Sequence, residues 1–418
     1  MRTARRRETR YCRRLPRTPG RQRNGPPPRP GPMSPMPRPL YLLMLCNLVL
    51  GTGVFVLGGI LTSVAESLQV GIGAAGQAMT AYAVATALLA PLVLVATGGW
   101  PRRRVLVGGL LLFALGNFVC AAAQNLPTLL AGRVLMGMGA VFTPVSGSIA
   151  IALAPPAQRG RALSLVFLGI SLSYVVGTPL GAWLGLRYGW RWPVGLVGGC
   201  ALLAAAALVA LLPRALSAPG ASFAGLSRLL LQPPVAAALG LTLLYFTAIF
   251  TVFSYIGPVL HALTPLTPEG MSVTLMLFGI AGVVGTLTGG WANDRFGGQR
   301  TLPVQLGVLA STMALVPLTA GHYAAVVAVF FAWGVAGFGM MAPQPPRLAA
   351  LGPTQTPILL SLNSSMLYLG TACGAAIGGA AAGSVGFEHL AWVGMPFAAA
   401  GLLLLLAGPR PPIAPPPR

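Results

Sequence analysis

The sequence predicts an all-α membrane protein with twelve transmembrane helices, arranged as two pseudo-symmetric six-helix bundles. Of its 418 residues, 55% are hydrophobic and only 8% are charged, whereas charged residues make up roughly 25% of a soluble globular protein. Apolar runs recur along the chain, and each has about the 20 residues that a helix needs to cross a bilayer. Helices are expected because an open strand in lipid would leave backbone groups unpaired.

Twelve apolar runs, separated by Gly, Pro, Arg or polar residues, define the expected spans. The first six form an N-terminal bundle over residues 40–212, and the last six form a C-terminal bundle over residues 234–408. Residues 213–233 are expected to be a cytoplasmic linker, and residues 409–418 a cytoplasmic tail. The expected spans are 40–62, 73–97, 105–124, 128–152, 162–185, 193–212, 234–258, 271–292, 302–320, 323–343, 356–383 and 390–408.

The first 39 residues differ from the rest of the chain because they hold 12 of its 27 arginines, interleaved with proline. Such a segment has too little apolar surface to form a core, so we expect a disordered basic tail on the cytoplasmic side. Met33 and Met36 are alternative starts, which would remove most of this tail from the protein. The net charge of +22 would suit nucleic acid, but its concentration in the tail argues against such a partner. The apolar run from Leu40 is too long for a cleaved leader and is expected to be an anchor.

The positions of the arginines also predict the orientation of the protein in the membrane. With the N-terminus in the cytoplasm, 24 arginines lie on the cytoplasmic side, only Arg187 and Arg191 lie outside, and Arg133 lies within a span. Without the tail the count is still 12 against 2, and loops rich in arginine stay on the cytoplasmic side. We therefore expect a multi-pass protein of the bacterial inner membrane, in contact with the lipid bilayer and with both termini in the cytoplasm.

Motifs of the first half recur in the second half in the same order, which indicates two six-helix repeats. Repeats of this kind place the substrate site near the middle of the membrane, between the halves. The matches are Thr-Gly-Gly-Trp at 97–100 and 288–291, Gly-Thr at 177–178 and 370–371, and Gly-x-Gly followed by Pro at 137–144 and 337–343.

The segment between the eighth and ninth expected spans, residues 289–300, resembles the Gly-x-x-x-Asp-Arg-x-Gly-x-Arg loop signature of the Major Facilitator Superfamily. Asp294 could accept hydrogen bonds from a helix N-terminus or from arginines near the start of the fifth span. The alternative is a solvated turn with a helix cap. The corresponding first-half loop, residues 100–104, has no acid, so any ionic latch would be one-sided. The resemblance implies a gating role for Gly290, Asp294, Arg295, Gly297 and Arg300.

Arg133 is the only ionisable residue placed well within an expected span. An arginine inside the membrane is costly and by default marks a site that faces an aqueous cavity. It also matches the Arg-x-x-x-Gly-x-Gly pattern in the fourth helix of drug/proton antiporters of the same superfamily. The alternative is an arginine that extends to the outer interface.

The fifth span carries Gly177, Pro179 and Gly181, which resemble the Gly-Pro-x-x-Gly core of the antiporter signature, with Thr178 inserted before Pro179. Small residues allow helices to approach closely, and proline deforms the backbone locally. Packing alone would explain the glycines, whereas the proline in mid-span favours a functional role.

Segments of the first, second, seventh and eleventh expected spans are similar to the arabinose-efflux-permease-like exporters, over roughly residues 40–408. The resemblance implies export of sugars, chloramphenicol-like drugs or other metabolites. That branch usually has a carboxylate directly before the Phe of the first helix, and here the position is Val54. Since no other acid or His is placed inside the membrane, we expect weak or absent proton coupling, with facilitated diffusion or another coupling ion as the alternatives.

The candidates for the substrate cavity are polar or amphipathic side chains within otherwise apolar spans. For each of them, an interhelical hydrogen bond is the alternative explanation. The candidates are Asn47, Tyr82, Arg133, Tyr174, Tyr245, Tyr255, Asn363 and Tyr368.

The sequence therefore predicts a secondary active or facilitative transporter, a monomer, that exports small organic compounds by alternating access between its halves. The alternatives are an importer of the same fold and a membrane sensor that does not transport. An enzyme is not expected, because the spans offer no catalytic acid, base, metal cluster or activated nucleophile. No cofactor and no metal site are expected.

Overall fold

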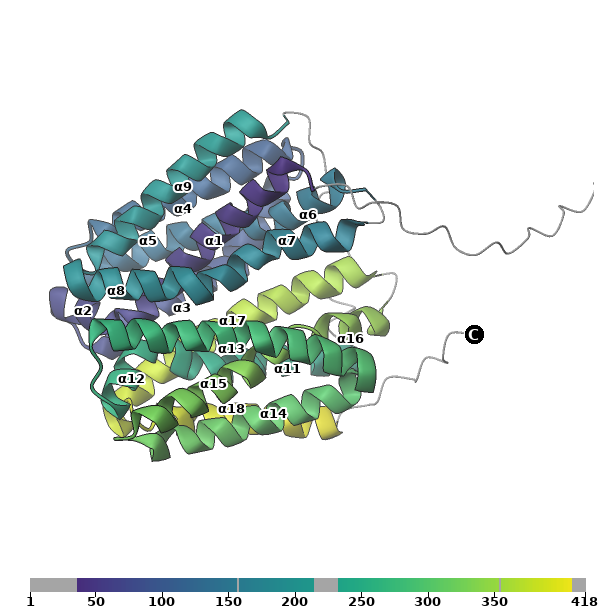
Figure 1. The fold of residues 1–418 in the computed structure, drawn as a ribbon. Helices are drawn as coiled ribbons and strands as arrows, with labels where there is room; N and C mark the ends of the chain where they lie inside the picture. The colour runs from purple at the N-terminus through teal and green to yellow at the C-terminus, as the bar shows by residue number, and fades with distance from the viewer. Residues whose placement is uncertain (1–35, 156–157, 214–231, 353–354, 408–418) are drawn as a thin grey trace, which may run out of the picture. The chain divides into compact units, whose positions relative to one another are not determined.

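The computed structural model describes residues 36–155, 158–213, 232–352 and 355–407. Most of the expected N-terminal tail and linker, and the whole expected C-terminal tail, lie outside these residues. The described part is helical and contains no strand. Within it, twelve helices are long and apolar enough to cross a membrane, which confirms the predicted fold class (Figure 1).

The first half of the chain supplies six spans. The first is α1 with the short α2 after it, the second α3, the third α4, the fourth α5 and α6, the fifth α7, a π-turn η2 and α8, and the sixth α9. Their bounds are α1 Arg38–Gly59, α2 Leu61–Ser67, α3 Ile72–Ala96, α4 Arg102–Ala121, α5 Leu126–Gly139, α6 Phe142–Leu153, α7 Arg159–Leu172, η2 Ser173–Gly177, α8 Thr178–Tyr188 and α9 Arg191–Leu211.

The second half supplies the other six spans in the same order. The seventh is α11 followed by α12, the eighth α13, the ninth α14 with a 3-10 turn η3, the tenth α15 and α16, the eleventh α17 and the twelfth α18. Their bounds are α11 Pro233–Phe253, α12 Ile256–Leu263, α13 Pro268–Phe296, α14 Gly298–Leu315, η3 Val316–Thr319, α15 Tyr323–Gly339, α16 Gln344–Leu351, α17 Thr356–Val385 and α18 Leu390–Ala407.

Arginines mark one end of the spans. We call it the basic end, and we call the other end, where α2, α8 and α12 lie, the apposed end. The arginines are found at the starts of α1, α4, α7 and α14, at the end of α13 and in α16. They are Arg38, Arg102, Arg103, Arg104, Arg159, Arg161, Arg295, Arg300 and Arg347.

Four spans are interrupted where the sequence predicted continuous helices. The first and seventh break at Ile60 and at residues 254–255, and the fourth and tenth break at residues 140–141 and 340–343. Pro144 lies three residues after the break in the fourth span, and Pro343 lies within the break in the tenth; proline removes a backbone donor and crowds the preceding turn. The first and fourth spans of each repeat are therefore divided into two shorter helices.

The halves pack on each other chiefly through α3 against α17, η2 and α8 against α13, and α1 and α2 against α12. Gly73 of α3 faces Gly379 of α17, and a Cβ added at Gly73 would lie 2.5 Å from the Gly379 carbonyl oxygen. Only glycine permits this approach of two backbones. Because α2, α8, α12 and the beginnings of α3 and α13 all lie at the apposed end, the contacts between the halves concentrate there.

Candidate functional site

Aromatic side chains from both halves meet in the middle of the protein. Phe55 of α1 stacks on Tyr174 of η2 with ring centroids 4.5 Å apart. Tyr174 in turn contacts Phe338 of α15 at 4.8 Å and Phe253 of α11 at 5.9 Å, while Phe55 contacts Phe250 at 6.4 Å. We call these five residues the central aromatic cluster. Rings at these separations attract one another and offer a large apolar surface to an organic ligand.

The spacing of phenylalanines in the sequence indicates this cluster, although the predicted cavity residues do not include them. Phe246, Phe250 and Phe253 follow one another in α11 at spacings of four and three residues, which places them on one face of a helix. Only Tyr174 of the cluster was among the predicted cavity residues. The phenylalanines were missed because selection for polar groups excludes them.

Two further predicted cavity tyrosines lie near the cluster. Tyr82 of α3 and Tyr368 of α17 are both close enough to Tyr174 to influence its hydroxyl electrostatically. Tyr82 is buried, whereas Tyr174 and Tyr368 are half-buried. The structure thus brings together phenols from the two halves, next to the rings of Phe55 and Phe338. Their hydroxyls would supply hydrogen bonds at the edge of an otherwise apolar surface.

Arg133 lies inside the N-terminal half, with 1% of its surface exposed. Its Nη1 donates to the carbonyl oxygen of Gly53 at 3.1 Å and to that of Val54 at 3.4 Å. The guanidinium also interacts electrostatically with Tyr82 and Cys120, and its Nε has no hydrogen-bond partner in the described residues. A side chain held against the backbone of α1 does not extend to the outer interface. Its role towards a substrate stays a prediction.

The other predicted cavity residues form hydrogen bonds to helices of their own half. The Tyr245 hydroxyl donates to the Ala336 carbonyl at 2.5 Å, and the Tyr255 hydroxyl donates to the Ala375 carbonyl at 2.8 Å. Asn47 is fully buried, whereas Asn363 is half-buried in α17 and accepts a hydrogen bond from Thr242. These geometries match the alternative explanation of interhelical hydrogen bonding and leave a substrate role untested.

The antiporter-like motif of the fifth span lies at the contact between the halves. The π-turn η2 covers residues 173–177 and ends at Gly177, and α8 begins at Thr178 with Pro179 in its first turn. The Pro179 carbonyl accepts a hydrogen bond from Ser272 of α13 at 3.1 Å, while Gly181 packs against Val56. A π-turn holds one more residue than an α-turn, so it accommodates the Thr178 insertion.

The predicted gating motif is mostly helical, which corrects the expectation of a loop. Gly290, Asp294 and Arg295 lie in the last turns of α13, which continues to Phe296, four residues beyond the predicted end. Gly297 alone connects it to α14 and has φ 76°, a conformation that glycine adopts readily. Arg300 lies in the first turn of α14. Asp294 is exposed and forms no ion pair within the described residues.

Val54, the expected position of the missing carboxylate, is buried in α1. Its carbonyl is one of the two that bind Arg133, so the backbone of residue 54 lies within hydrogen-bond reach of the buried cation. The described acids, Glu66, Glu269, Asp294 and Glu388, all lie at or near helix ends.

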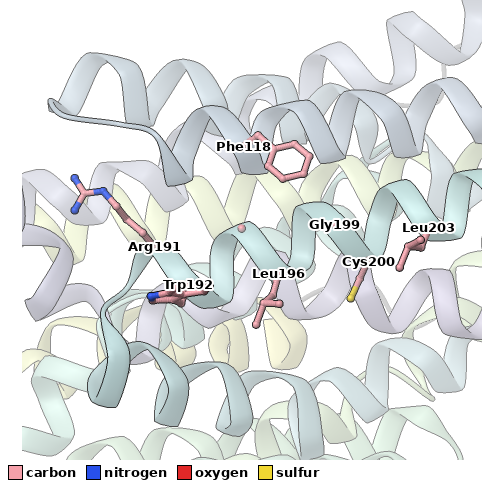
Figure 2. A pocket seen from close by; sticks show the side chains of 8 residues that line it. Phe118, Arg191, Trp192, Leu196, Gly199, Cys200 and Leu203 are labelled. Carbon is pink, nitrogen blue, oxygen red and sulfur yellow. The ribbon is translucent and has the colours of Figure 1, made fainter.

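Two cavities open elsewhere, and neither lies between the halves. One, of about 460 Å³, is an apolar groove between α4, which carries Phe118, and α9, which carries the other lining residues such as Trp192 and Leu196 (Figure 2). The other, of about 530 Å³, lies among α13, α14 and α15, with Arg300 and Gln305 in its lining. Each is confined to one half, and neither is lined by a residue of the central aromatic cluster.

The described residues contain no group of three or more His, Cys, Asp or Glu side chains placed to bind a metal. What the site offers is an aromatic surface and phenol hydroxyls contributed by both bundles of six spans, with a buried guanidinium inside the N-terminal one. In transporters built from repeated halves, the substrate site lies at such a boundary between the repeats. Fold and site together define a membrane transporter with two repeated halves.

The model of the Major Facilitator Superfamily matches residues 43–354. The chain therefore belongs to this superfamily of transporters, and the predicted resemblance is confirmed. It is 28% identical over 356 residues to the uncharacterized MFS-type transporter YbcL of Bacillus subtilis, covering 85% of this chain and 91% of that protein. It is 29% identical over 374 residues to the inner membrane transport protein YdhP of Escherichia coli, covering 89% and 96%.

Solved structures share the fold. A bacterial homolog of the human lysosomal transporter Spinster, in an inward-facing and occupied conformation, superposes with a TM-score of 0.72 at 15% identity, covering 88% of this chain and 95% of that one. The D-xylose-proton symporter superposes with a TM-score of 0.70 at 16% identity, covering 89% and 97%.

Proposed function

We propose that the protein exports small organic compounds across the bacterial inner membrane by alternating access between its two halves. The observation that carries this proposal is the central aromatic cluster, since its members come from α1 and η2 on one side and from α11 and α15 on the other. A ligand bound there would be released from one half as the halves separate. The name of the relative YdhP, an inner membrane transport protein, and the similarity to arabinose-efflux-like exporters support the location and the direction.

The same proposal includes an orientation. We infer that the basic end faces the cytoplasm, because short arginine-rich loops stay on that side. The apposed end then faces outwards and is closed here by the contacts of α3 with α17 and of α8 with α13. Across the second contact, Trp183 Nε1 donates to Glu269 Oε1 at 3.3 Å. Opening towards the outside requires these contacts to separate, while the basic end closes.

The test is to prevent that separation. In a background that lacks the exposed Cys200, cysteines at Trp183 and Glu269 joined by a short thiol cross-linker should stop transport, and cleavage of a reducible linker should restore it. Either cysteine alone, treated in the same way, is the control. Transport that continues through the cross-linked protein would contradict alternating access at this contact.

The direction of transport is determined by a separate experiment. A thermal-shift screen of sugars, chloramphenicol and related compounds identifies a ligand, because a compound that binds the native state raises the melting temperature. Accumulation of that ligand in inside-out vesicles, with none in right-side-out vesicles, indicates export. The reverse result indicates an importer, and a ligand that binds but does not cross favours a sensor.

A further inference from the structure

Each half holds a polar junction at equivalent positions of its repeat. The N-terminal junction consists of Asn47, Thr143, Ser146 and the Val166 carbonyl, and the C-terminal junction of Thr242, Gln344 and Asn363. Asn47 is the tenth residue of α1, as Thr242 is of α11. Val166 is the eighth residue of α7, as Asn363 is of α17. The two junctions therefore join the same spans of the two halves.

The N-terminal junction is closed. The Asn47 amide donates to the Leu43 carbonyl, to Ser146 Oγ and to the Val166 carbonyl at 3.2–3.3 Å. Its Oδ1 accepts from Thr143 Oγ1 at 3.4 Å. With donors and acceptor occupied and the side chain fully buried, this junction has nothing to offer a ligand.

The C-terminal junction is open. Gln344 Nε2 donates to the Ala238 carbonyl at 2.7 Å and to Thr242 Oγ1 at 2.9 Å, and Thr242 donates to Asn363 Oδ1 at 2.7 Å. The contact with a carbonyl fixes which end of the Gln344 amide is the nitrogen. Gln344 Oε1 is left buried without a hydrogen-bond partner in the described part of the chain. Buried polar atoms in native proteins are nearly always paired, so a missing group is indicated.

Arg347 adds a positive charge to this junction. It lies on α16 three residues after Gln344, about one helical turn or roughly 5 Å nearer the basic end. The side chain is half-buried, and its Nη1 is buried with no partner among the described residues. Asp294, the described acid at the basic end, forms no ion pair there. A buried guanidinium nitrogen without an acceptor is a strong attractor for an anion.

We propose that the C-terminal junction binds a hydroxylated organic acid, the substrate class of the transporter. This inference rests on the proposed function. The carboxylate accepts hydrogen bonds from Arg347 and from the Asn363 amide, whose Oδ1 is already occupied by Thr242, and a hydroxyl of the acid donates to Gln344 Oε1. The break at residues 340–343 allows α16 to close over the ligand.

The experiment compares two hydroxy acids with their neutral alcohols on the purified full-length protein. Gluconate is paired with sorbitol, and mandelate, which carries a ring suited to the central aromatic cluster, with phenylethanediol. Calorimetric titration and thermal shift should show binding of at least one acid, with an affinity at least tenfold above that of its alcohol. Binding should weaken as salt is added, because salt screens the contact with the arginine.

Two variants locate the site. Asn363→Asp keeps Oδ1 as the acceptor for Thr242 and replaces the donor by a negative charge, so it should weaken acid binding at least tenfold with an unchanged melting temperature. Arg347→Gln should weaken it to a similar degree. Arg104→Gln, an exposed arginine at the same end, is the control and should bind as wild type does.

The outcomes separate this inference from the proposed function. If neither acid binds, or if acid and alcohol bind equally, the C-terminal junction is not an anion site. The same holds if both variants bind as wild type does. The proposed function is judged by the cross-linking result, which does not depend on the substrate: transport of a neutral compound that the cross-link stops would uphold alternating access and refute only the substrate class.

Discussion

The two halves repeat one backbone plan but differ in the side chain buried at the same place. Four residues before the equivalent Gly137 and Gly337, the first half carries Arg133 and the second carries Trp333, each 1% exposed. Arg133 binds carbonyls of α1, whereas Trp333 packs on Phe278 at 5.0 Å and on Phe330 at 5.4 Å. One half thus buries a charge at the position where the other buries an aromatic ring.

The fifth and eleventh spans differ in a second way. The fifth contains the π-turn over residues 173–177, whereas its counterpart α17 is a continuous helix of 30 residues. The π-turn carries Tyr174 into the central aromatic cluster and places its carbonyl against Gly279 of α13. The extra residue of the π-turn therefore distinguishes the fifth span from α17, which packs on α3 as a continuous helix.

The largest effect is expected at Arg133. Arg133→Ala should weaken substrate binding at least tenfold with expression nearly intact, because a hydrogen bond to a charged group contributes about 1.5–3 kcal/mol. Titration of wild type and variant with the compound found by thermal shift measures the affinity. Trp333→Phe is the matched change in the other half and should leave binding within twofold. Normal binding by both Arg133→Ala and Arg133→Lys would show that the arginine serves only the packing of α1.

The next largest effect concerns coupling. Wild type should show little response of substrate flux to an imposed pH gradient in proteoliposomes, since the described spans hold no carboxylate in their interior. Val54→Glu would place an acid beside the buried Arg133 and should increase that response. The idea fails if wild type concentrates substrate in strict dependence on the pH gradient and Glu66→Gln does not change this.

The two polar junctions should differ in their contribution to stability. Asn47→Leu removes the bonds of two amide hydrogens, which three acceptors share, and one accepted bond, so at roughly 0.6 kcal/mol for each in a membrane protein it should cost about 2 kcal/mol. Thr242→Val removes one accepted bond and the bond of one hydroxyl hydrogen, which faces Asn363 Oδ1 at 2.7 Å and the Ala238 carbonyl at 3.5 Å, and should cost about 1 kcal/mol. Thermal unfolding of both variants in detergent measures the two losses of stability. An equal or larger loss for Thr242→Val would mean that the C-terminal junction is structural rather than open to a ligand.

A smaller effect is expected at Asp294. If it stabilises the state in which the basic ends of the halves meet, near Arg159 and Arg161, Asp294→Asn should increase labelling of a single cysteine placed on the basic-end half of α17. A water-soluble maleimide measures the rate. The first-half loop has no acid, so no equivalent variant exists there, and unchanged labelling of a folded protein would count against a latch.

The smallest effect is expected from the N-terminal segment. Removal of residues 1–32 should change neither membrane insertion nor transport, because the segment is rich in arginine and proline and has no apolar periodicity. Membrane fractionation and vesicle flux are the measurements. Loss of membrane insertion and of transport would show that the segment takes part in one or the other.

Sequence periodicity and composition were sufficient to place all twelve spans, because a bilayer requires about 20 apolar residues for each crossing helix. They missed the breaks in four spans, since an interruption of one to four residues does not alter the apolar run. They also ended the eighth span too early at the gating motif. Polar residues such as Asp294 and Arg295 indicate a loop by composition, yet nothing in them prevents another helical turn before Gly297.

By itself the sequence determined the membrane class, the two-fold repeat and the superfamily, because these follow from local composition and from motifs of fixed spacing. Only the tertiary structure decided which groups meet. The convergence of Phe55, Tyr174 and Phe338, and the contrast between a closed junction at Asn47 and an open one at Gln344, depend on contacts between residues far apart in the chain. No local pattern encodes such contacts, because they arise from the packing of whole helices.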